Sequence, residues 1–179
     1  MKVFNVLLAI ILGLLAHVIS LVAGNSITIY SWDRADQWVC STTSVSVNGG
    51  RDGKQPDGQV CDFTTTKVPA SGSVNIYPPQ GWIGTIHTVY SLHNCHNPRI
   101  IAEVTFQGFA GLTYYDVSAV DNCCDNYGIH WILTHSLTAT PSCCVASPCS
   151  GSYTKPHDVQ TKFTGEVDLI IWTGRYYGW

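Results

Sequence analysis

Glutamate is nearly absent from this chain of 179 residues, where it occurs only at Glu103 and Glu166. Charged residues of both signs make up just 12% of the sequence, and lysine and arginine form no basic run. Proteins that bind nucleic acids or anionic membranes through charge need such runs, so we expect neither kind of partner. The scarcity also singles out Glu103, because it lies inside the apolar strand pattern IIAEVTFQG.

Two motifs that are frequent in secreted or metal-binding proteins are missing as well. The sequence has no Asn-x-Ser/Thr sequon for N-linked glycosylation and no Cys-x-x-Cys spacing of the kind used by zinc sites. The cysteine count is even, which in a secreted chain predicts up to four disulfides with about 105 possible pairings. The cysteines are Cys40, Cys61, Cys95, Cys123, Cys124, Cys143, Cys144 and Cys149.

The N-terminus carries the one long apolar run, which extends almost unbroken from Val3 to Ala23 behind a basic start. The run ends in small residues. This pattern is typical of a secretory signal peptide, which we place at residues 1–24 with cleavage near Gly24. The run also has about the 20 residues that a membrane span requires, so an uncleaved anchor is the alternative. Residues 25–179 are expected to form a single secreted domain without membrane association.

Every periodic stretch after the apolar run favours β-strand, because apolar residues alternate or β-branched residues dominate. Turns rich in Gly, Pro and Asn separate these stretches. The expected strands are SITIYS, WVCSTTSVSV, QVCDFTTTKV, VNIY, GTIHTVYSL, two hairpin arms, GIHWILT, DVQTKF and DLIIWT. No segment of ten or more residues shows a helical stripe with caps at both ends. The sequence therefore predicts an all-β fold, a sandwich or a barrel.

The best-defined element is a hairpin between Ile100 and Asp121. Its loop, Gly108–Gly111, has a common hairpin length and sets Glu103 directly opposite Asp116. One face of the hairpin then carries Ile101, Glu103, Thr105 and Gln107 opposite Leu112, Tyr114, Asp116 and Ser118. The other face is apolar and is expected to lie in the core. Asp121 has the opposite strand parity, but it lies at the strand end, where the chain can turn it back.

Two directly opposed carboxylates repel each other, because their Cβ atoms are roughly 4.5–5.5 Å apart. Such a pair indicates a bound cation, a shared proton or a ligand with several hydroxyl groups. The alternatives are a solvated sheet face on which acids are merely spread, or a slipped register that separates the pair. The candidate ligand-binding residues are Glu103, Tyr114, Asp116 and Asp121.

Several stretches resemble known proteins. AEVTF and YYDVSAVD of the hairpin, with SGSVNIYPPQGWIGTIHTVY before them, resemble the thaumatin-like family. The resemblance implies a thaumatin-like β-sandwich whose acidic cleft is formed by Glu103, Asp116 and Asp121. In that family the cleft is implicated in binding β-1,3-glucan, and weak glucanase activity is attributed to some members. The family's cleft arginine aligns with Val89, and its sixteen-cysteine pattern is missing here.

A closer similarity is to small secreted fungal proteins labelled "deoxyribonuclease one" proteins. The segments that carry it are PPQGWIG, AEVTFQGFAGLTYYDVSAV and HDVQTKFTGEVDLI. The label implies nuclease activity, but nuclease action requires basic residues for the phosphates as well as acids, and only the acids are present.

Two other groups of side chains are suited to ligands. The segment HNCHNP (His93–Pro98) and nearby His87 could bind copper or zinc, although Cys95 is also a candidate for a disulfide. We expect no metal and no other cofactor. The C-terminal segment IIWTGRYYGW carries rings suited to stacking on sugars or docking on a protein; alternatively, its first ring is part of the core and the rest is a frayed end. These rings belong to Trp172, Tyr176, Tyr177 and Trp179.

The sequence predicts a secreted monomer that binds a cell-wall polysaccharide or a host protein through its acidic face, without catalysis. Glu103 and Asp116 would hydrogen-bond hydroxyl groups of the ligand, and Asp121 would line the rim. The first alternative is a hydrolase, either a glucanase or a nuclease, because carboxyls ~5–5.5 Å apart fit a retaining glycosidase. The second alternative is a secreted effector that binds proteins only.

Overall fold

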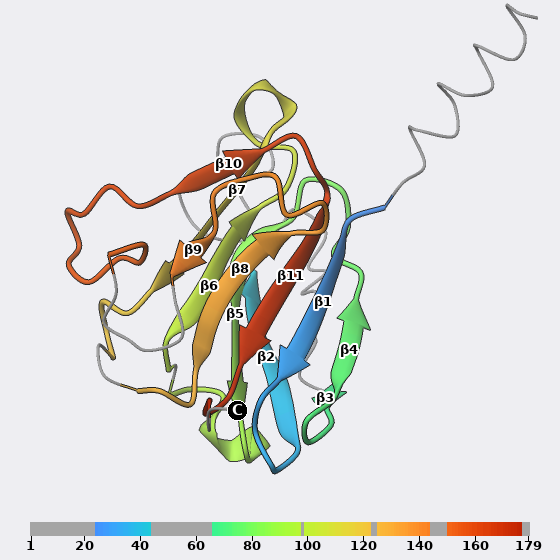
Figure 1. Cartoon of the computed structure of the whole chain (residues 1–179), viewed down its shortest axis with the longest axis vertical. Helices are drawn as coiled ribbons and strands as arrows, with labels where there is room; N and C mark the ends of the chain where they lie inside the picture. Colours follow the sequence, from blue (N-terminus) through green and yellow to red (C-terminus); the bar gives the residue numbers. More distant parts are fainter. Residues whose placement is uncertain (1–23, 44–65, 98, 123–124, 144–149, 177–179) are drawn as a thin grey trace, which may run out of the picture.

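Two β-sheets packed face to face hold almost all of the regular structure (Figure 1). The structure, a computed structural model, describes residues 24–43, 66–97, 99–122, 125–143 and 150–176. The predicted all-β sandwich is therefore confirmed.

The five-stranded sheet has the strand order β4-β1-β11-β8-β9. In this sheet β1 and β11 are parallel neighbours, whereas the other pairs are antiparallel. Two strands that are far apart in the sequence thus lie side by side near the middle of the sheet. The strands are β1 (Ser26–Ser31), β4 (Ser73–Ile76), β8 (Ile129–Thr134), β9 (Ser142–Cys143) and β11 (Asp168–Thr173).

The six-stranded sheet has the order β10-β7-β6-β5-β2-β3, and all of its pairs are antiparallel. Its strands are β2 (Gln37–Thr43), β3 (Lys67–Val68), β5 (Ile83–Val89), β6 (Ile101–Thr105), β7 (Thr113–Ser118) and β10 (Lys162–Thr164). Two short 3-10 turns interrupt the loops, η1 (Leu92–Asn94) and η2 (Phe109–Gly111). Among the described residues, no helix has the length and apolar character needed to cross a membrane.

The core lies between the sheets and takes alternate residues from each strand. Ile27, Ile29 and Ile171 of the five-stranded sheet are fully buried, and each such side chain contributes about 1.5–3 kcal/mol to folding. The apolar face predicted for the hairpin is confirmed as core. Its buried members are Ile100, Ala102, Val104, Phe106, Thr113, Tyr115, Val117 and Ala119. A slip of one residue would turn all of them outward, so their burial fixes the register of β6 on β7.

The outer face of the five-stranded sheet carries a cluster of aromatic rings. Tyr30, Trp172 and Trp131 form one row across β1, β11 and β8. Trp172 stacks on Tyr30 at 4.7 Å between ring centroids and on Trp32 at 5.0 Å. Tyr176 meets Trp32 edge-on at 5.0 Å, and all five rings are half-buried. The interpretation that placed Trp172 in the core is therefore wrong, because the rings pack on one another outside it.

One disulfide joins Cys40 of β2 to Cys95, with 5.6 Å between the Cα atoms. Cys40 pairs with His87 across the strands, so the disulfide holds the segment around η1 against the outer face of the six-stranded sheet. His87 is consequently buried, although its side chain points away from the core. Cys143 is also disulfide-bonded.

Several predictions fall outside the described residues. These are almost all of the expected signal peptide (residues 1–24) and Cys61, Cys123, Cys124, Cys144, Cys149, Tyr177 and Trp179.

Candidate functional site

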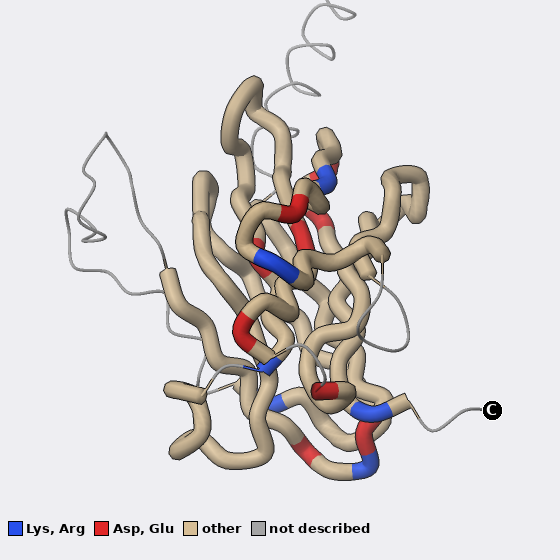
Figure 2. Tube along the Cα trace, turned by 90° about the vertical axis from the view of Figure 1, so that its left-hand side faces the viewer, with Lys and Arg blue, Asp and Glu red and all other residues tan. Residues whose placement is uncertain are grey.

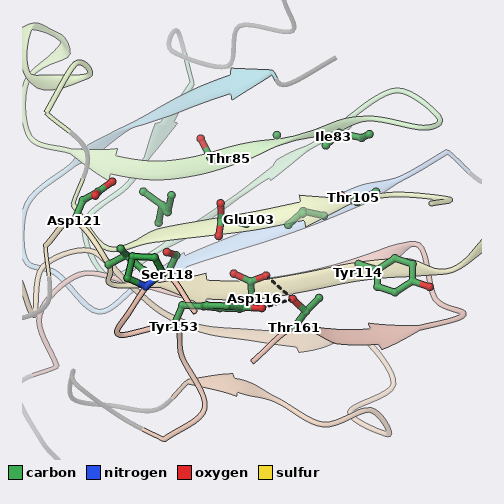
Figure 3. Close-up of a pocket in the computed structure, with 15 residues that line it drawn as sticks. Ile83, Thr85, Glu103, Thr105, Tyr114, Asp116, Ser118, Asp121, Tyr153 and Thr161 are labelled. Atoms are coloured by element: carbon green, nitrogen blue, oxygen red, sulfur yellow. Dashed lines mark hydrogen bonds between the residues drawn. The ribbon is translucent and has the colours of Figure 1, made fainter. Parts of the chain in front are cut away.

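The two acids of the hairpin are direct neighbours across β6 and β7. Glu103 pairs with Asp116 in the register of the two strands, which confirms the predicted pairing. The next outward pairs on either side are Thr105 with Tyr114 and Ile101 with Ser118. In Figure 3 Glu103 stands between Thr85 of β5 and Asp116 of β7. Both carboxyls therefore lie on the outer face of the six-stranded sheet, as expected.

A pocket of about 590 Å³ crosses this acid pair. Its floor is formed by β5, β6 and β7, and one wall comes from the segment that leads to β10. The lining residues used below are Thr85, Glu103, Asp116, Ser118, Asp121, Tyr153 and Thr161. None of the described residues that line the pocket is a lysine, an arginine or a histidine. Charged residues are sparse along the described trace as a whole, with both signs interspersed (Figure 2).

Asp116 is the most enclosed charged group of the pocket, with a relative exposure of 7%. Its Oδ2 accepts a hydrogen bond from the Thr161 hydroxyl at 3.4 Å. Its Oδ1 is buried and accepts no hydrogen bond from any described residue. A buried, ionised oxygen without a donor is costly, so Asp116 is poorly stabilised as a carboxylate.

Burial and the charge of Glu103 raise the pKa of Asp116 from 3.8 to about 7. A hydrogen bond between the two carboxyls, which requires a proton on one of them, acts in the same direction. The Thr161 hydroxyl and the charge of Lys162 oppose this rise in the pKa. The protonated form of Asp116 is therefore favoured up to a higher pH than that of an exposed aspartate.

The other two predicted site residues lie at opposite ends of the pocket (Figure 3). Asp121 is exposed and lines the pocket just beyond the end of β7, which agrees with the expectation that the chain turns it back. The Tyr114 hydroxyl donates to the Phe109 carbonyl oxygen at 3.2 Å. Tyr114 thus forms part of the pocket wall while its hydroxyl is engaged by the hairpin loop.

Two pocket residues were missed by the sequence reasoning, Tyr153 and Thr161. Tyr153 pairs with Ser118 in an isolated parallel bridge, and its hydroxyl hydrogen-bonds the Thr161 hydroxyl at 2.8 Å. The strand predicted from Asp158 begins only at Lys162, because the Asp158 carboxylate accepts hydrogen bonds from turn amides instead. This turn was the one local signal that the segment could fold back over the sheet.

The histidine-rich segment is not arranged as a metal site. Cys95 forms the disulfide with Cys40 and so is not available as a metal ligand. Burial lowers the pKa of His87; the charge of Arg99 adds to this shift, and a hydrogen bond with the Cys95 backbone opposes it. Within the described ranges, no group of three or more His, Cys, Asp or Glu side chains is placed to hold a metal ion.

The fold and the site define a disulfide-bonded β-sandwich with an acidic pocket on the outer face of one sheet. No protein-family model matches the chain. Over 148 residues the chain is 31% identical to the antigenic protein SchS21 of Stachybotrys chartarum, an alignment that covers 83% of this chain and 92% of SchS21. The chain therefore belongs to the same family as SchS21.

Among solved structures, the chain is similar to the protein elicitor MoHrip2 of Magnaporthe oryzae. The TM-score is 0.56 at 12% sequence identity, and the match covers 84% of this chain and 98% of MoHrip2. At that identity the likeness concerns the fold alone. The relative SchS21 comes from a fungus, in agreement with the resemblance to small fungal proteins.

Proposed function

We propose that this chain is a secreted, thaumatin-like fungal protein that binds a neutral cell-wall polysaccharide, with β-1,3-glucan the candidate, in its acidic pocket. Glu103 and Asp116 hydrogen-bond hydroxyl groups of the ligand, and Asp121 lines the rim. The observation that carries the proposal is the pocket of about 590 Å³ that crosses the opposed acids. A volume in this range accommodates a few sugar rings.

The chemistry of the lining supports an uncharged ligand with many hydroxyl groups. Thr85, Ser118, Tyr153 and Thr161 add hydroxyls around the two carboxyls. A phosphate or another anion would meet acidic side chains and no cation from the described part of the lining, which disfavours nucleic acids. The resemblance of the hairpin to the thaumatin-like cleft points to the same class of ligand, although buried Val89 stands where that family has an arginine.

Secretion is supported by three independent features. The N-terminal run has the pattern of a signal peptide, Cys40 and Cys95 are oxidised, and the SchS21 relative is an antigenic protein. Disulfides persist in oxidising compartments and are rare in the cytosol.

A pull-down on insoluble β-1,3-glucan tests the proposal. The full chain is expressed, and purified protein is incubated with the glucan and, separately, with cellulose. We expect retention on the glucan, and we expect the double variant Glu103→Ala with Asp116→Ala to lose at least tenfold in affinity. The matched control is Glu166→Ala, which removes the only other glutamate, outside the pocket. A folded wild-type chain that does not bind, or a double variant that binds as well as wild type, contradicts the proposal.

A glycoside hydrolase is the second candidate, and the raised pKa of Asp116 favours it specifically. An acid with a pKa of about 7 can protonate a leaving group, while a directly opposed carboxylate can act as nucleophile. Release of reducing sugar from β-1,3-glucan that is abolished by Glu103→Gln but not by Glu166→Gln would establish this activity. Binding without release would leave the non-catalytic role.

A further inference from the structure

Among the described residues that line the pocket, none offers the acid pair a positive charge. The charge of Lys162 acts on Asp116, but its Nζ donates to the Gln160 carbonyl oxygen at 2.7 Å. Asp121 adds a third carboxyl to the same pocket. Two adjacent carboxylates in such surroundings would repel each other with little compensation.

The pair also lacks the arrangement that a metal ion requires. Calcium takes about six to eight oxygen ligands, and magnesium requires near-octahedral geometry. No group of three or more acidic, histidine or cysteine side chains within the described residues is placed to supply such a shell. In Figure 3 the Asp121 carboxyl points from the strand end, apart from the opposed pair.

A proton held between the two carboxyls accounts for both observations, the missing positive partner and the missing metal arrangement. If Asp116 carries it, Oδ1 has a hydrogen-bonding role toward Glu103, and the pair holds one negative charge instead of two. Asp116 is more than nine-tenths buried and lines the pocket, so the carboxyl that carries the orphaned oxygen is part of the binding site.

We propose that the pocket binds its ligand with a single proton shared between Glu103 and Asp116, and that this state selects uncharged polyols over cations. The inference rests on the proposed function and specifies the protonation state in which the site works. The proton is used within the pair, and the remaining carboxyl oxygens accept hydrogen bonds from neighbouring sugar hydroxyls, which can donate. Loss of the proton restores the repulsion between the two carboxylates and disrupts their arrangement, so the ligand dissociates.

The other titratable groups near Asp116 do not take over the role of this proton, which is to reduce the negative charge of the pair. Glu103 faces it from β6, and Tyr114 and Asp121 belong to β7 and its end. Tyr153 comes from the segment that leads into β10, and Lys162 is the first residue of β10. On β5 the next outward position after Thr85 is His87, whose pKa is lowered, mainly by burial.

Calorimetric titration with a soluble β-1,3-glucan oligosaccharide between pH 5 and 9 tests the inference. We expect a constant Kd at low pH and, above a pH of about 7, a Kd that rises about tenfold per pH unit, because one proton must be retained for binding. Asp116→Asn replaces the protonated acid by a permanent donor and should bind with a Kd that does not change with pH. Glu166→Gln, outside the pocket, should keep the wild-type profile.

A second readout does not depend on the ligand. Carbon-13 NMR of the side-chain carboxyls in the free protein should give a pKa of about 7 for Asp116, and Glu103→Gln should lower it. An Asp116 pKa below 5, or a wild-type Kd that is flat from pH 5 to 9, overturns the shared proton even if glucan binds. Calcium binding that Glu103→Gln abolishes overturns it as well. Absence of glucan binding at every pH, with the NMR result as expected, instead contradicts the proposed function.

Discussion

The two outer faces of the sandwich differ in whether their side chains find interaction partners within the protein. On the five-stranded sheet, Tyr30, Trp172, Trp32 and Tyr176 stack or meet edge-on, so each ring has a partner within the protein. On the six-stranded sheet, Asp116 is buried beside another acid and one of its oxygens accepts no hydrogen bond from a described residue. Both faces look away from the core, and the buried carboxyl oxygen without a donor among the described residues lies on the second.

The contrast separates a structural face from a candidate binding face. Aromatic rings that pack on one another exclude water from the sheet and stabilise the fold. A carboxyl held in unfavourable surroundings lowers stability and is retained where it serves a function. Substitutions on the first face should therefore change stability, and substitutions on the second should change titration and ligand binding.

The largest effect is expected on the aromatic face. Trp172→Ala should lower the free energy of unfolding by about 2–3 kcal/mol, because it removes a half-buried ring that stacks on two others. Urea denaturation measures the change. Glucan retention by the folded fraction should stay at the wild-type level.

The matched control lies on the opposite sheet. Phe163 is 63% exposed, so Phe163→Ala should change the free energy of unfolding by no more than about 0.5 kcal/mol. Equal losses for the two variants would show that the aromatic cluster is not a distinct stabilising unit.

The next effect is of opposite sign and depends on pH. The folded-state pKa of Asp116 is raised from 3.8 to about 7, so the folded protein binds more protons than the unfolded chain between these values, and stability falls as pH rises through that window. Asp116→Asn removes this loss. It should raise the free energy of unfolding by about 2 kcal/mol at pH 8 and by almost nothing at pH 3. An equal effect at both pH values would point to packing as the cause.

The smallest effect is expected for Thr161→Val, which keeps the shape but removes the hydroxyl that donates to Asp116. Because this donor lowers the pKa of Asp116, its loss should raise that pKa further, as followed by carbon-13 NMR. The free energy of unfolding should change by no more than about 0.5 kcal/mol, since Thr161 is exposed. An unchanged pKa would mean that the hydroxyl does not act on the carboxyl in solution.

Local patterns were sufficient to predict the hairpin but not its surroundings. A four-residue loop and the alternation of apolar residues determine the pairing of Glu103 with Asp116, because both are properties of one continuous segment. The contribution of Tyr153 and Thr161 could not be predicted, since it depends on a distant loop folding over the sheet. The disulfide partner of Cys40 could not be predicted either, because 55 residues separate it from Cys95 and spacing alone favours no pairing.

The side-by-side placement of β1 and β11 has a consequence for biogenesis. Ser26 pairs with Asp168, so the five-stranded sheet stays incomplete until nearly the whole chain has left the ribosome. Contacts between such distant segments are slow to form, and the half-finished sheet exposes Ile27 and Ile29 in the meantime. The nascent protein should therefore depend on chaperones until its last strand is inserted, and truncation before β11 should yield an aggregate instead of a smaller folded unit.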